Sequence, residues 1–201
     1  WVTSGKAGTQ GSFAPTIQGT YGCSGEQILD AMSAATGLDF DGHYKFGLSK
    51  SIIEDWISGK YHVGPTFVET VVVPADDADG VSSVESLGVG KDYFLKAYGV
   101  ANAGDNIDFD AACSLSGNVP DDTWSDDVTG YESYGTSLLD LFVDGASGVW
   151  GSTCNATGHT YEIPYAGTGN LLDLMVYDVY SPNNVGSLSV DIIEDKWVDL
   201  W

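Results

Sequence analysis

The feature that most constrains the fold is a series of short apolar runs, separated by turns rich in glycine and aspartate, that extends from Thr66 to Glu194. Residues 67–73 form the first run, and Pro74 ends it. Many short strands with frequent turns are typical of a sandwich or a barrel. We therefore predict a mainly β, jelly-roll-like β-sandwich over residues 66–194. The further strands are expected at about 81–88, 92–99, 107–115, 137–143, 159–165, 171–178 and 186–193.

Residues 23–63 carry helix signals instead of strand signals. Ser24 and Gln27, three positions apart, make a capping box, and apolar residues then recur at helical spacing until Gly37. A serine and a glycine also bound a second apolar segment, and the limits expected for it are Ser49 or Ser51 and Gly59. The sequence therefore predicts a hairpin of two short helices ahead of the sandwich.

The two ends of the chain differ from both of these segments. Residues 1–22 are rich in Gly, Ser and Thr, which predicts an extended tail. Residues 195–201 follow the last predicted strand as a C-terminal extension and include Trp197 and Trp201. Exposed tryptophans at a terminus would be unusual for a monomer. An extended tail can also add to the open edge of a neighbouring sheet, so we expect a homo-oligomer or polymer that assembles through the N-terminal tail.

The charge balance is strongly acidic, with 29 acidic residues, 7 basic residues and a formal net charge of −22. Nucleic acid is therefore excluded as a partner, because phosphate recognition needs clustered Lys and Arg. An anionic membrane surface is excluded for the same reason, and no run reaches the length of a membrane span. The chain begins with Trp1 and has no signal peptide, which fits a mature secreted product, extracellular or at the cell surface. The strongly acidic surface of the protein favours divalent cations as partners.

Three cysteines, Cys23, Cys113 and Cys154, show no zinc-binding spacing. Because an exported protein favours disulfides, we expect Cys113 and Cys154 to be bonded, since both lie in β regions that can be neighbours. Cys23 is then left as a buried thiol.

An oxygen-rich loop, residues 177–187, separates two alternating runs at 171–176 and 188–192, which are interpreted as an antiparallel pair. The loop contains the carboxylate of Asp178 and the adjacent amides of Asn183 and Asn184. Such oxygens suit a hard cation such as Ca²⁺. The alternative is a turn rich in Asn and Asp that binds nothing, because these residues are common in turns.

Residues 116–136 form the longest irregular stretch, in which aspartates accompany Trp124 and Tyr131. Long loops on a β scaffold often carry binding residues. Aromatic rings beside carboxylates suit a sugar, because a ring packs on its apolar face while carboxylates accept hydroxyl protons. A solvated acidic loop, anchored to the core by its tryptophan, is the alternative.

The residues from Asp178 to Ser187, with Asn183-Asn184-Val185-Gly186 before the closing strand, resemble the calcium and sugar loop of the galactose-binding bacterial lectins of the LecA type. Residues 73–84 are similar to the first strand and turn of that family, and 93–104 to its third strand. The resemblance implies Ca²⁺ ligands from the side chains of Asp178, Asn183 and Asn184 and from the carbonyls of Ala103 and Ser181. The resemblance also implies Asp178, Val179 and Asn183 as carbohydrate-binding residues. Trp124 and Tyr131 of the long loop complete the candidate set on the ground of their residue types alone.

A second resemblance covers residues 22–58, from Gly22-Cys23-Ser24-Gly25 onward. This stretch is similar to a short helical module of exported bacterial proteins. Leu48 stands where the module has a second cysteine, which leaves Cys23 without that partner.

These observations favour a secreted, calcium-dependent, galactose-type lectin-like protein. The alternative is a self-assembling structural subunit of an extracellular filament or surface layer, with a purely structural calcium ion. No convincing catalytic set occurs in the sequence, so we expect a binding protein and not an enzyme.

Overall fold

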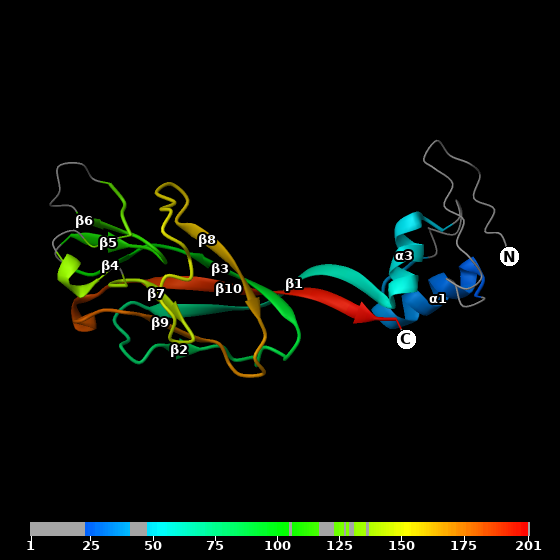
Figure 1. Cartoon of the computed structure of the whole chain (residues 1–201). Helices are drawn as coiled ribbons and strands as arrows, with labels where there is room; N and C mark the ends of the chain where they lie inside the picture. The colour runs from blue at the N-terminus through cyan, green and yellow to red at the C-terminus, as the bar shows by residue number, and fades with distance from the viewer. Residues whose placement is uncertain are drawn as a thin grey trace. The chain divides into compact units, whose positions relative to one another are not determined.

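The computed structural model describes residues 23–40, 48–104, 106–116, 123–126, 128, 131–135 and 137–200. The predicted tail, residues 1–22, lies outside the described residues, as does much of the stretch 116–136. The described chain divides into two compact units (Figure 1). Pro65–Glu194 forms one, and the residues before Pro65 and after Glu194 together form the other.

The smaller unit contains the two helices α1 (Gly25–Thr36) and α3 (Lys50–Ser58). The capping box at the start of α1 is present, because the Ser24 hydroxyl accepts from the Gln27 backbone and the Gln27 side chain accepts from the Ser24 backbone. Ser49 caps α3, so the helix limits predicted from the sequence are confirmed. The apolar faces pack into one core, Ile28, Leu29, Met32, Phe40, Ile52, Trp56 and Leu200, against which the partly buried free thiol of Cys23 lies.

Three antiparallel sheets make the protein mainly β, as predicted (Figure 1). One sheet has the order β1-β10-β3-β8, the second β2-β9-β7 and the third β4-β5-β6. The bounds are β1 (Lys60–Pro74), β2 (Val81–Ser82), β3 (Asp92–Tyr98), β4 (Ala101–Asn102), β5 (Ile107–Phe109), β6 (Ser114–Ser116), β7 (Leu141–Val143), β8 (Thr160–Ala166), β9 (Asp173–Val176) and β10 (Ser187–Asp199).

The core of the larger unit is built by period-two alternation. Leu188, Val190 and Ile192 of β10 are fully buried, while the residues between them are partly exposed. Strand β3 alternates in the same way, with Leu95 and Ala97 inside. This alternation gives each strand one face in the sandwich core and one face toward solvent.

The interpretation of 171–176 and 188–192 as an antiparallel pair is wrong. Strand β9 pairs with β2 and β7, whereas β10 lies between β1 and β3. Residues 177–186 therefore cross from one sheet to another and do not close a hairpin. Alternation identifies the buried face of a strand, but it contains no information about the strand that forms the hydrogen bonds.

Four predicted strands are also shorter or divided: 137–143 is a strand only in β7, 171–178 only in β9, and the other two are 107–115 and 81–88. The run 107–115 is broken between β5 and β6, because the buried Asp110 carboxylate accepts from the backbone N–H groups of Ala112 and Cys113 and so makes a turn. The run 81–88 is a strand only in β2. Beyond it, the carboxylate of Glu69 accepts from the backbone N–H groups of Val84 and Glu85, which interrupts the strand pairing there.

The predicted disulfide between Cys113 and Cys154 is confirmed, with the two Cα atoms 5.8 Å apart. The Asp110 carboxylate beside it also accepts from the Tyr161 hydroxyl at 3.0 Å and lies 3.0 Å from Nδ1 of His159. Burial raises the pKa of the Tyr161 hydroxyl to about 12. The hydroxyl therefore keeps its proton, and the bond to Asp110 persists across the physiological pH range.

None of the helices in the described part of the chain is long and apolar enough to cross a membrane.

Candidate functional site

The crossing segment between β9 and β10 folds through local bonds. Oδ1 of Asp178 accepts from the backbone N–H of Tyr180 at 3.1 Å. A turn of 3-10 helix, η2 (Ser181–Asn183), follows, and the N–H of Asn184 donates to the carbonyl of Ser181 at 2.9 Å. The polar residues that predicted a turn thus do form one, and the turn fixes the directions of the side chains that follow.

Two distant segments hold this turn in place. Asn102 and Val185 exchange both backbone hydrogen bonds, at 3.0 and 2.8 Å, and the N–H of Ala75 donates to the carbonyl of Gly186. The side chains add two further bonds: Nδ2 of Asn183 donates to the Ala103 carbonyl at 2.9 Å, and Nδ2 of Asn184 donates to the Ala75 carbonyl at 2.8 Å. Side chains and carbonyls from three parts of the chain therefore meet here.

The position of the Asn183 amide requires a glycine at residue 104. Its φ is +75°, and a Cβ atom at this position would lie 2.7 Å from Nδ2 of Asn183. A side chain would therefore be strained by the backbone and would displace the amide of Asn183.

A pocket of about 220 Å³ opens beside the turn. It brings together five of the residues predicted from the sequence: Ala103, Tyr131, Asp178, Val179 and Asn183. Apolar residues from β5 and the segment before β7 line the rest of the wall, among them Ile107, Leu138 and Leu139. A polar edge on an apolar wall is the usual composition of a small-molecule site.

The remaining two predicted ligands are buried next to this pocket and do not line it. The backbone carbonyl of Ser181 already accepts one hydrogen bond, from Asn184, and retains a second lone pair. Asn184 is only 5% exposed, and its Oδ1 has no hydrogen-bond donor within the described part of the chain. A buried amide oxygen without a partner is costly, by about 1–3 kcal/mol.

Trp124 lies elsewhere. Its ring packs on His159, with the ring centroids 4.4 Å apart, and against the sandwich core. The bond between His159 and the buried Asp110 holds the imidazole in place under it. The structure therefore separates Trp124 from the pocket at Asp178, and the position of its ring corresponds to the alternative interpretation, a tryptophan that anchors an acidic loop.

Sequence reasoning did not identify Tyr180 as a site residue. Tyr180 lines the pocket, and 64% of its surface is exposed. An aromatic residue two positions after Asp178 was the available signal, because sugar sites combine rings with carboxylates. Leu138 and Leu139 could not have been found in this way, since they are distant in sequence.

Among the described residues, no three His, Cys, Asp or Glu side chains lie together as a possible metal site. Within the described part of the chain, Asp178 is the one carboxylate that lines the pocket. A cation here would therefore depend on neutral amide and carbonyl oxygens, which suits Ca²⁺ and not zinc.

Comparisons with known proteins find similarity among solved structures alone. No family model matches the chain, and no curated protein matches it. A solved structure described as "EclA N-terminal domain; PllA-like lectin" is similar to this chain at 15% sequence identity, with a TM-score of 0.41. The similarity covers 64% of this chain and 97% of that one. The assignment of a function therefore depends on the residues of the pocket.

Proposed function

We propose that this protein is a calcium-dependent carbohydrate-binding protein that acts outside the cell. The observation that carries the proposal is the unpartnered, buried amide oxygen of Asn184, one residue after the pocket-lining Asn183. Buried polar groups are almost always hydrogen-bonded or bound to a metal, so we expect this oxygen to have a ligand.

The donor set fits Ca²⁺. Asp178 would supply an anionic oxygen, and Asn183 and Asn184 would supply amide oxygens. The carbonyls of Ala103 and Ser181 each accept one bond and have a lone pair left. Ca²⁺ takes six to eight oxygen ligands, so water or ligand hydroxyls would complete the set.

A bound Ca²⁺ would supply coordination to two adjacent hydroxyl oxygens of a sugar. The chain's own residues would then select and orient that sugar. Oxygens of Asp178 and Asn183 would accept hydroxyl protons, while Val179, Tyr131 and Tyr180 would contact the apolar edge of the ring. A galactose-like pyranose is the ligand we propose, in line with the resemblance of the loop.

Action outside the cell is supported by two features. The Cys113–Cys154 bond is of the kind that persists in oxidising compartments. The net charge of −22 keeps the surface solvated and raises the local concentration of divalent cations.

A calorimetric titration with Ca²⁺, followed by galactose, tests the proposal. We expect calcium to bind the wild type and galactose to bind only in its presence. Asp178→Asn keeps the shape but removes the charge, and we expect it to abolish calcium binding. Glu162→Gln neutralises an exposed carboxylate of β8 and serves as the matched control.

Two results would contradict the proposal. If the wild type binds no calcium, the metal site does not exist. If calcium binds but galactose has no effect, the ion has a structural role, and the filament or surface-layer subunit becomes the better interpretation.

A further inference from the structure

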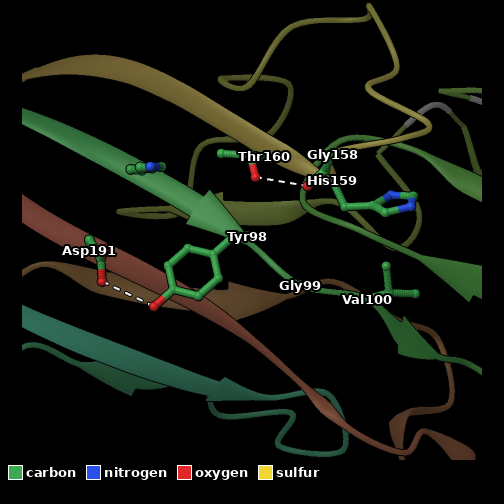
Figure 2. Close-up of a pocket in the computed structure, with 8 residues that line it drawn as sticks. Tyr98, Gly99, Val100, Gly158, His159, Thr160 and Asp191 are labelled. Carbon is green, nitrogen blue, oxygen red and sulfur yellow. Dashed lines mark hydrogen bonds between the residues drawn. The ribbon is translucent and has the colours of Figure 1, made fainter.

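We propose that a second pocket, on the outer face of the sheet β1-β10-β3-β8, is a calcium-independent binding site for a neutral saccharide (Figure 2). The pocket has a volume of about 470 Å³. This volume lies within the usual range of small-molecule sites. None of the residues assigned above to the calcium pocket lines it.

The strands place its polar groups on one surface. Lys96 and Tyr98 alternate with the buried Leu95 and Ala97 along β3, so both face outward. Asp191 holds the same outward position on the neighbouring strand β10, between two buried residues. Thr160, opposite Tyr98 in the pairing of β3 with β8, adds a wall on the other side.

The aromatic ring of Tyr98 is held in a fixed position. Its hydroxyl donates to Oδ1 of Asp191 at 3.2 Å, and the ring lies between β3 and β10 in Figure 2. The Thr70 hydroxyl donates to the same oxygen at 2.6 Å and fixes the carboxylate. A ring held in this way offers an apolar surface to the C–H groups of a sugar at little cost in conformational entropy.

The other groups supply what sugar hydroxyls need. Both donors to Asp191 bind Oδ1, which leaves Oδ2 to accept a hydroxyl proton. The Lys96 ammonium forms no ion pair within the described part of the chain and can donate to a hydroxyl or ring oxygen. Gly99 and Gly158 line the pocket without side chains and keep it open. His159 contributes backbone, because its ring points away from Tyr98 toward Asp110 (Figure 2).

The charges favour a neutral ligand. Among the described residues, one ammonium and one carboxylate line the pocket, so their charges balance. The chain as a whole carries a net charge of −22, which repels an anionic sugar before it arrives. A neutral pyranose uses the donor, the acceptor and the ring together.

The test uses the full chain in EDTA, which removes calcium, so that the proposed calcium site cannot contribute to sugar binding. A failure of this proposal is then distinguishable from a failure of the proposed calcium-dependent function. Methyl glycosides of galactose, glucose and mannose are titrated while backbone amide NMR shifts are recorded. We expect at least one of them to shift the amides of Tyr98, Gly99 and Thr160. Asp191→Asn and Lys96→Met should each weaken that binding about 10-fold or more, because each removes a hydrogen bond to a charged group.

Asp92→Asn is the matched control, since Asp92 lies on the outer face of β3 but outside the pocket. It should leave the affinity unchanged. Absence of shifts in these amides with all three glycosides overturns the proposal. So does binding that survives both pocket variants, or a clear preference for methyl glucuronide over methyl glucoside.

Discussion

At Gly104 two physical requirements meet in one residue. The backbone has a positive φ, and the space that a Cβ atom would fill is occupied by the Asn183 amide. We expect Gly104→Ala to lower the free energy of unfolding by about 1–3 kcal/mol and to abolish or strongly weaken calcium binding. Calorimetry and chemical denaturation measure the two effects.

Gly90→Ala separates these requirements. Gly90 has a φ of +77°, and a Cβ atom added to it would meet no neighbouring atom within 4 Å, so this variant carries the backbone strain without the collision. It should lose stability but bind calcium as the wild type does. If Gly104→Ala also binds calcium normally, the Asn183 side chain is not a ligand.

The buried carboxyl group of Asp140 predicts that the stability of the protein depends on pH. Burial, and secondarily the nearby carboxylates of Asp126 and Asp110, raise its pKa to about 6, although the Gly148 N–H bond opposes this. The native state therefore binds a proton more tightly than the unfolded chain does. This contribution to stability is complete below about pH 4 and is lost as the pH rises through about 6.

Asp140→Asn should therefore reduce the fall in Tm of the wild type between about pH 4 and pH 7, because the amide can accept the Gly148 bond without ionising. Asp92→Asn removes the same formal charge from an exposed position and is the control for net charge. Equal pH profiles for both variants would show that Asp140 is not the titrating group.

At the scale of whole elements, the two helices could be predicted and the strand pairings could not. A helix is limited by local signals, and the serine caps and glycine stops of α1 and α3 lie where the sequence placed them. A strand is completed by a distant partner. The alternation in β9 and β10 revealed their buried faces correctly but suggested a hairpin that does not exist.

The disulfide joins the turn between β5 and β6 to the segment before β8, across 41 residues of sequence. Closing a loop of this length in the unfolded chain is worth about 4 kcal/mol in the chain-entropy model. We expect the double variant Cys113→Ala/Cys154→Ala to lose about 2–4 kcal/mol in urea denaturation. Cys23→Ala should leave the unfolding of the sandwich unchanged, because Cys23 packs against the helical core; an equal loss in both variants would contradict the assignment.

At the scale of the molecule, the candidate site is assembled from segments that the sequence does not connect. The loop from Asp178 to Asn184 was recognisable because its oxygens are close together in the chain. The apolar wall from Leu138 and Leu139 and the position of Trp124 depend on how the sheets pack. Periodicity and spacing contain no information on that packing, so sequence reasoning found the polar edge of the pocket, with Val179 and Tyr131, but not the wall formed by Leu138 and Leu139.

The separation of these segments also has a kinetic consequence. The Asn183 and Asn184 side chains bind carbonyls that lie 80 and 109 residues earlier in the chain. Contacts between such distant residues tend to form late in folding, after the loops between them have closed. A calcium ion bound there would stabilise the native state without stabilising the folding transition state.

Stopped-flow measurements should therefore find that chelation accelerates unfolding and leaves the refolding rate unchanged. A refolding rate that rises with calcium would contradict this prediction. The ion would then determine how long the folded protein lasts, and not how quickly it forms.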